Sequence, residues 1–189
     1  MLYDLSLPLR GAEARSEHFN QRDSGIARLG HVGTHLDRVL GTTVPLDYFR
    51  SRGLLFDVSG FCGEREVLPG DISLETVQRA DFILFRTGYL TAHGYGTPPY
   101  MQAFFALSWK LIDALLDKDV HFIGLDARGV RPNEEHKEAD SRCERRGVFV
   151  IENLNTLEVL PREIPFTAFV MCFDAGGSGV PCRVIAETD

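Results

Sequence analysis

The stretch GHVGTHLDRVLG, residues 30–41, places two histidines four residues apart and an aspartate two residues further on. Imidazole nitrogens and a carboxylate oxygen suit a divalent ion such as Zn²⁺ or Mn²⁺, and three ligands leave room for water and substrate. Gly33, and the lack of a glutamate directly after His31, argue against the helical H-E-x-x-H zinc motif. The pattern predicts a strand that ends in a loop, with His31, His35 and Asp37 either as metal ligands or as polar residues satisfied by the backbone.

Length and charge limit the kind of protein. The chain has 189 residues, 44% of them hydrophobic, so we expect residues 1–189 to form one domain. The net charge of −7 and the scattered basic residues argue against a nucleic-acid partner and favour a small molecule. Without a signal peptide pattern or a membrane-length apolar run, we expect a cytoplasmic protein with no membrane partner. Four cysteines without C-x-x-C spacing are expected to be thiols: Cys62, Cys143, Cys172 and Cys182.

Apolar runs separated by turn residues predict a mixed α/β fold. Serine N-caps predict helices over residues 74–79 and 109–118, and Asn133 is expected to cap a third, polar helix that Gly147 ends. The glycine-rich residues 173–181 precede a strand pattern rather than a helix, which favours a hairpin or turn over a phosphate site. Strands are expected at residues 3–7, 26–32, 54–58, 82–86, 120–125, 148–151, 166–173 and 183–186.

The segment H-x-G-T-H-x-D resembles the signature of the cyclase family of metal-dependent hydrolases, which includes bacterial kynurenine formamidase and isatin hydrolase. The resemblance implies the family's swivelling β/β/α domain, assembled as a homo-oligomer of two or four copies. Further similar blocks keep the family's order over nearly the whole chain: YDLSLPL (3–9), LLFDVSG (54–60), DFILFRTGY (81–89), HFIGLDARGV (121–130), GVFVIENLNTL (147–157) and GSGVPCRVIAE (177–187).

The resemblance also implies a set of metal ligands. The two histidines and the aspartate of the motif would bind the metal, and Glu152, which begins the E-N-L block, would complete the site; a salt bridge to an arginine is the alternative for Glu152. Many members use a further histidine twelve residues before that glutamate, where this chain has Asp140. An aspartate can bind a harder ion such as Mn²⁺. His136 lies one helical turn before Asp140, so it could point to the site instead, or the two could pair on the surface.

The motif departs from the family after Asp37. Relatives continue H-x-G-T-H-x-D-x-P-x-H, and the last histidine serves kynurenine formamidase as a second-metal ligand and general acid/base. This chain has Val39 and Gly41 at the proline and histidine positions. The lost ligand argues for one ion rather than two. The candidates for a replacement acid/base are His93, Tyr89 and His136.

We therefore expect a metal-dependent hydrolase that cleaves a carbon–nitrogen bond in a small amide, formamide or lactam, as an arylformamidase does. A divalent ion, Zn²⁺ or Mn²⁺, would generate the hydroxide that attacks the carbonyl and would stabilise the oxyanion. Two alternatives stay open. One is a catalytically reduced member that binds a small molecule, suggested by the changes at Val39, Gly41 and Asp140, and the other is a cyclase or dehydratase that uses the same metal site.

Overall fold

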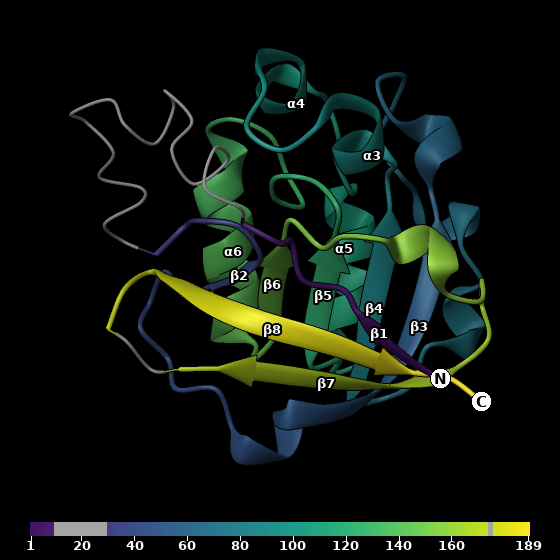
Figure 1. Ribbon diagram of the computed structural model, residues 1–189, viewed down its shortest axis with the longest axis vertical. Helices are drawn as coiled ribbons and strands as arrows, with labels where there is room; N and C mark the ends of the chain where they lie inside the picture. The colour runs from purple at the N-terminus through teal and green to yellow at the C-terminus, as the bar shows by residue number, and fades with distance from the viewer. Residues whose placement is uncertain (10–29, 174–175) are drawn as a thin grey trace.

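The strands of the computed structural model form one sheet that closes on itself (Figure 1). The structure describes residues 1–9, 30–173 and 176–189. The strands are β1 (Leu2–Asp4), β2 (His35–Asp37), β3 (Arg50–Asp57), β4 (Asp81–Arg86), β5 (Phe122–Leu125), β6 (Phe149–Glu152), β7 (Phe166–Cys172) and β8 (Gly179–Glu187). Their order is β1-β8-β2-β6-β5-β4-β3-β7, and β7 also pairs with β8, so seven strands form a ring to which β1 is added. The pairs β3–β4, β4–β5 and β5–β6 are parallel, and the other pairs are antiparallel.

The helices complete a layered arrangement. They are α3 (Tyr89–His93), α4 (Pro98–Gln102), α5 (Trp109–Leu116) and α6 (Glu135–Arg145), with 3₁₀ turns at Leu46–Phe49, Ser59–Phe61, Pro69–Asp71, Leu74–Thr76 and Leu157–Val159. In Figure 1, β7 and β8 cross in front of the central strands, while α5 and α6 lie behind those strands. Among the described residues, no helix combines the length and the apolar character that crossing a membrane requires.

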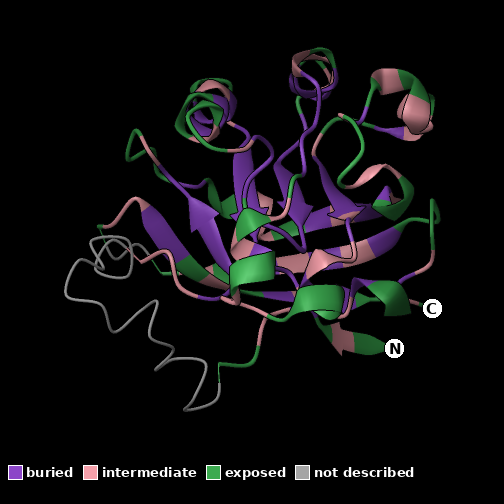
Figure 2. Ribbon diagram, turned by 90° about the horizontal axis from the view of Figure 1, so that it is seen from above, coloured by how far each residue is buried: buried purple, intermediate pink, exposed green. Residues whose placement is uncertain are grey.

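Two hydrophobic clusters hold these layers together. In β4, Ile83 and Phe85 belong to the cluster that includes α5 and α6, whereas Phe82 and Leu84 belong to the cluster that includes β7 and β8. Successive side chains of a strand point to opposite faces, so a strand covered on both faces is apolar throughout. Figure 2 shows this burial along the central strands. The run DFILFR thus forms a strand in the middle of the molecule.

Two of the three helices expected from the sequence are confirmed. The helix expected over residues 109–118 is α5, and the Ser108 side chain caps it by accepting a backbone N–H from its first turn. The third expected helix is α6, and Gly147 follows its end with a φ of +73°. Asn133 does not cap α6, which begins at Glu135, because Asn133 itself adopts a left-handed conformation one residue before the N-cap.

The helix expected over residues 74–79 is wrong. The structure has only the 3₁₀ turn Leu74–Thr76, and the Ser73 side chain does not cap it. Instead, the Ser73 hydroxyl donates a hydrogen bond to Glu163, 90 residues away in the sequence. A cap residue marks a helix only when its oxygen is available to the backbone, and here a tertiary contact engages it.

The strand expected at residues 26–32 is wrong in the part that the structure describes. Residues 26–29 lie outside the described residues, residues 30–34 form no strand, and the strand of the motif is β2. His31 and Gly33 therefore lie in a loop that precedes the strand. β2 pairs with β6 on one side and β8 on the other, so tertiary pairing rather than an apolar run defines it. The hairpin expected over residues 173–181 agrees with the antiparallel pairing of β7, which ends at Cys172, with β8, which begins at Gly179.

The segment after β2 is held by a carboxylate from α6. Glu144 is 3% exposed and accepts the backbone N–H groups of Leu40 at 2.6 Å and Thr42 at 2.7 Å. Because the substitution Glu144→Ala removes both charge-assisted hydrogen bonds, it is expected to lower the free energy of unfolding by about 1–3 kcal/mol in urea titrations. Glu138→Ala on the same helix removes only an exposed ion pair and should change it by less than about 0.5 kcal/mol. Equal effects of the two substitutions would contradict a specific role for Glu144.

Candidate metal centre

The pairing of β2 with β6 places three of the expected ligands on one face of the sheet. Leu36 points into the cluster between the strand layers, so His35 and Asp37 point to the opposite face, towards α6. His35 is paired directly with Glu152 at the end of β6, and directly opposed residues of antiparallel strands share a face. Two residues 117 positions apart in the chain are thereby brought side by side.

The first group of candidate ligands consists of His31, His35 and Asp37. His31 Nδ1 lies 3.0 Å from His35 Nε2 and 3.0 Å from Asp37 Oδ1, and His35 Nε2 lies 3.5 Å from Asp37 Oδ1. Ligands about 2.0–2.1 Å from a tetrahedral ion are roughly 3.3 Å apart. The three atoms therefore have the mutual spacing of ligands that share one ion. Ser178, in the β7–β8 connection, holds His31 through a 2.9 Å contact between its Oγ and His31 Nε2.

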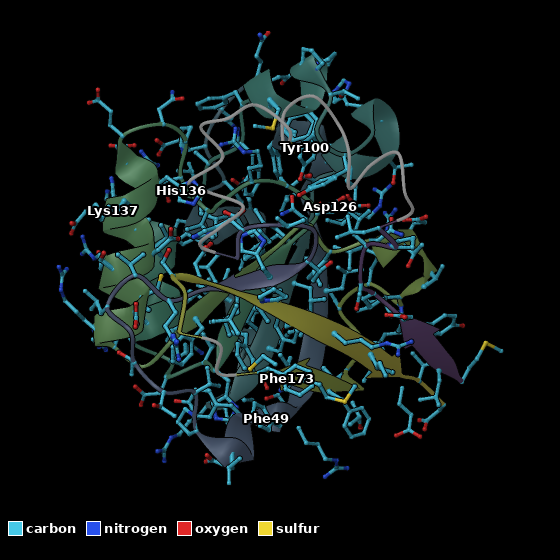
Figure 3. The ribbon with its side chains drawn as sticks, turned by 60° about the vertical axis from the view of Figure 1, so that its left-hand side comes forward. Phe49, Tyr100, Asp126, His136, Lys137 and Phe173 are labelled. Carbon is cyan, nitrogen blue, oxygen red and sulfur yellow. The ribbon has the colours of Figure 1, made fainter. Side chains whose placement is uncertain are left out.

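A second group consists of Asp37, His136 and Glu152. Helix α6 supplies His136, whose Nε2 lies 3.0 Å from Glu152 Oε1 and 3.1 Å from Asp140 Oδ2. Figure 3 shows His136 on the side of α6 that faces the sheet and Lys137 on the outer side. Asp37 belongs to both groups, so the two groups are candidate sites for two neighbouring ions.

Hydrogen bonds on the Nδ1 side of the His35 ring fix the orientation of that ring. Its Nδ1 donates to the Gly33 carbonyl at 2.8 Å, which leaves Nε2 directed at the cluster. The Asn153 side-chain amide donates to the same carbonyl at 2.9 Å, and the Tyr100 hydroxyl donates to Asn153 Oδ1. Gly33 has a φ of +62°, and a Cβ there would approach Leu9 to 2.9 Å. This explains the glycine of the motif. Neither Asn153 nor Tyr100 was predicted from the sequence, although Asn153 lies in the E-N-L block.

Buried oxygens in the cluster lack hydrogen-bond partners. Both carboxylate oxygens of Asp37, Oδ1 of Asp140 and Oε1 of Glu152 are fully buried, and none makes an interaction with hydrogen-bond geometry. Burying a carboxylate without a partner is costly, and a cation is a partner that all three carboxylates could share. The residues present therefore fit a divalent metal ion.

The ionisable groups of the cluster strongly perturb each other's protonation in the metal-free protein. Burial lowers the pKa of His35, but interactions with Asp37 and Glu152 outweigh it and raise the pKa to about 9. Burial likewise lowers the pKa of His136, and contacts with Asp140 and Glu152 raise it to about 11. Burial and the charge of Asp37 raise the pKa of Asp140 to about 7. The pKa of Asp37 falls well below its usual value, because the histidines outweigh its burial. In the metal-free protein, protons on His35 and His136 therefore supply the positive charge that a bound cation would supply.

A cavity of about 150 Å³ lies beside the cluster. His136 lines it, and so contacts both the candidate metal site and the space where a small molecule could bind. The ring of Tyr100 and the side chain of Arg128 also line it, the latter donating one hydrogen bond to the Met101 carbonyl at 3.0 Å. In Figure 3, Tyr100 lies across from α6. The remaining lining residues include Tyr89, Gln102, Phe104 and Asn133.

The candidate acid/base residues lie in different places. His93 is exposed at the end of α3, with its ring 5.7 Å from that of Tyr89, and neither group of candidate ligands among the described residues includes it. Gly41 is exposed with a φ of +77°, and a Cβ there would meet no atom within 4 Å. The side chain that the structure brings to the cluster is His136.

Two alternatives from the sequence are not what the structure shows. His136 and Asp140 do not form a surface pair, because Asp140 is only 5% exposed. Within the described part of the chain, the ion-pair partners of Glu152 are the histidines His35 and His136, not an arginine. A single ion was expected because a second ion would lack a ligand, and His136 offers a nitrogen that could bind one.

The chain belongs to the Cyclase family, whose sequence profile matches residues 3–131. The matched range contains the H-x-G-T-H-x-D motif and ends before the E-N-L block. No curated protein matches the sequence.

Solved structures share the mixed α/β fold with its closed seven-stranded sheet. A protein described as a potential metal-dependent hydrolase with cyclase activity is 22% identical with a TM-score of 0.76, and the match covers 98% of this chain and 96% of that one. A predicted metal-dependent hydrolase from Bacillus stearothermophilus is 20% identical with a TM-score of 0.71, over 98% and 97% of the two chains. Isatin hydrolase A from Labrenzia aggregata is 19% identical with a TM-score of 0.71, over 82% and 72%. At these identities the likeness establishes the fold.

Proposed function

We propose that this protein is a metal-dependent hydrolase that cleaves the carbon–nitrogen bond of a small amide, formamide or lactam, using Zn²⁺ or Mn²⁺. The observation that carries the proposal is the buried cluster around Asp37, whose carboxylate oxygens lack hydrogen-bond partners beside two histidines. The descriptions of the structural relatives as metal-dependent hydrolases and isatin hydrolase support it. A bound divalent ion would polarise the substrate carbonyl and acidify water.

The residues of the chain divide the work. His31, His35 and Asp37 would hold one ion. The Gly33 carbonyl accepts the Nδ1–H of His35, so a neutral His35 ring keeps its proton on Nδ1 and leaves Nε2 available to the metal. The second group, with Glu152 and His136, would hold another ion. Alternatively, His136 would move protons to and from the substrate, because it also lines the cavity. In either role, as a second-metal ligand or as an acid/base group, His136 would take the place of the histidine that the family motif has at the position of Gly41.

The cavity suits a small substrate. Its volume of about 150 Å³ corresponds to roughly one benzene-sized ring. A formanilide or a small lactam has a ring of this size next to the reacting carbonyl. Arg128 lines the same space and is suited to a substrate that carries an anionic group. We therefore favour a small aromatic or cyclic amide over a peptide.

The substitution His136→Ala is expected to reduce kcat/KM for such a substrate by about 10²–10⁴-fold, the usual cost of losing a proton-transfer group. His93→Ala is the matched control, and should leave kcat/KM within about twofold because His93 is exposed and outside both ligand groups. Metal content, measured on the same samples, distinguishes the two roles of His136. Activity lost with metal retained indicates proton transfer, and metal lost with activity indicates a ligand. A larger effect of His93→Ala would instead place the acid/base on α3.

Purified protein loaded with Zn²⁺ or Mn²⁺ and assayed on formanilides, lactams and esters tests the proposal as a whole. Turnover that a chelator abolishes and either ion restores is the expected result. The exposed position of Gly41, which offers no acid/base group, favours the second candidate, a small-molecule-binding protein. Retained metal with no hydrolysis of any substrate would favour that candidate. Absence of metal binding would exclude the hydrolase.

A further inference from the structure

Two cysteines face each other across the hairpin that borders the candidate metal centre. Cys172 is the last residue of β7 and is registered directly with Cys182 in β8. The two strands run side by side at the front of Figure 1. Both side chains are half-buried and pack against the cluster between the strand layers, so they share one face of the sheet. Both are thiols in this structure.

The backbone shows which type of cross-strand pair this is. The Cys182 N–H donates to the Thr34 carbonyl at 3.1 Å, on the side of β8 that pairs with β2. In a strand, the N–H and C=O groups of one residue point to the same side, so those of Cys182 point away from Cys172. The pair is therefore a non-hydrogen-bonded one, in which opposed Cα atoms are typically about 4.5 Å apart. Disulfides require Cα atoms roughly 4.4–6.8 Å apart, so the strands need not move apart to form one.

The hairpin that these cysteines would close also contacts the motif loop. Ser178 bonds to His31 through its side chain and accepts the Arg38 N–H through its carbonyl at 2.6 Å. Gly179 packs so closely that a Cβ there would lie 2.6 Å from the His31 nitrogen. The position of His31 therefore depends on Ser178 and on Gly179, the first residue of β8.

We propose that Cys172 and Cys182 form a reversible disulfide in exchange with a small-molecule disulfide such as oxidised glutathione, and that this bond braces the hairpin against His31. One protein thiolate attacks the glutathione disulfide and releases one glutathione thiolate. The second protein thiolate then attacks the mixed disulfide and releases the other. Two protein thiols are oxidised, one glutathione disulfide is reduced, and the two protons pass to the released thiolates. The bond does not depend on the proposed hydrolase function, whereas its effect on metal rests on that function.

The bond is tested on the full chain incubated with oxidised glutathione at pH 8.5, since burial raises the pKa of Cys182 and slows exchange at lower pH. After acid quenching, alkylation in denaturant should label two of the four cysteines, and peptide mass spectrometry should find Cys172 linked to Cys182 within one chain. Dithiothreitol should restore all four labels. Cys172→Ser and Cys182→Ser should each abolish the link, whereas Cys62→Ser should retain it. Four labelled thiols, glutathione adducts alone, or a bond between two copies would each overturn the proposal.

The effect on His31 is measured separately. Protein loaded with Zn²⁺ is mixed with a chromogenic chelator, and the release of the ion is followed for the oxidised and the reduced form. Oxidation is expected to slow release at least threefold in the wild type and to leave Cys172→Ser unchanged. Equal rates for the two forms of the wild type, with the disulfide shown to be present, would overturn the brace on His31. Failure to bind Zn²⁺ in either form would count against the proposed function, while the mass-spectrometric result would still decide the disulfide.

Discussion

Asp37→Asn is expected to abolish tight metal binding, and to do so more completely than substitution of any other candidate ligand. Among the described residues, Asp37 is the one that belongs to both groups of donors, and it lies 3.0 Å from His31 and 3.5 Å from His35. The substitution removes the charge from a fully buried site while keeping the side chain's size. Substituting a residue that only hydrogen-bonds to a metal ligand typically costs about 10–100-fold in metal affinity, so loss of a shared ligand itself should cost more than about 100-fold.

The measurement compares the stability of wild type and variant with and without metal. An ion that binds only the folded state adds about 2.7 kcal/mol to the free energy of unfolding at 100 times its dissociation constant. Zn²⁺ should therefore raise the thermal midpoint of the wild type and leave that of Asp37→Asn unchanged. Asp113→Asn is a matched control, because Asp113 is half-exposed and pairs with Arg142 on the surface of α5 and α6. An equal metal-induced shift in Asp37→Asn would contradict a metal site at Asp37.

The sequence allowed the fold to be predicted where local pattern and burial agree. The apolar run of β4 and the serine-capped helix α5 form as expected, because each is buried by a continuous stretch of sequence. β2 was placed wrongly since it has only three residues, two of them polar, and exists through its pairing with β6 and β8. The alternation in His35-Leu36-Asp37 is nevertheless a strand signal: the apolar residue faces the core and both polar residues face α6.

The candidate site was predictable in part, for a related reason. The sequence motif placed three donors close together, and the family resemblance added Glu152, which β6 brings beside His35. The choice between His136 and Asp140 depends on how α6 is rotated against the sheet, and a spacing of four residues puts both on one helix face without deciding it. In the structure both reach the cluster, and His136 is the one that contacts Glu152. The contact between Ser178 and His31 joins residues 147 positions apart, and no local sequence pattern predicts it.

If His35 and His136 both bind the metal, its affinity is expected to rise by about 100-fold between pH 7.5 and 8.5, and more steeply below pH 7.5, where Asp140, with a pKa of about 7, also loses a proton. In the metal-free protein the pKa of His35 is raised to about 9 and that of His136 to about 11, so both carry a proton throughout this range. Only the neutral imidazole binds a metal ion, and each proton released contributes about tenfold per pH unit. Protonated His35 stabilises the metal-free fold most fully below its unfolded pKa of about 6.5, and this contribution is lost as pH rises through about 9. Raising the pH therefore weakens the metal-free fold and strengthens metal binding.

Competition with a chelator of known pH dependence gives the affinity at each pH, and calorimetry in buffers of different ionisation enthalpy counts the protons released. With both histidines as ligands, the wild type should release close to two protons at pH 7.5, where Asp140 has already lost most of its proton. His136→Gln should release about one, with the pH dependence reduced to roughly tenfold per unit, because one titrating ligand is gone. His93→Gln should match the wild type, since His93 is exposed and outside the cluster. If affinity in the wild type did not change between pH 6.5 and 8.5, metal binding would not displace protons from His35 and His136. The ion would then have to bind through the carboxylates alone.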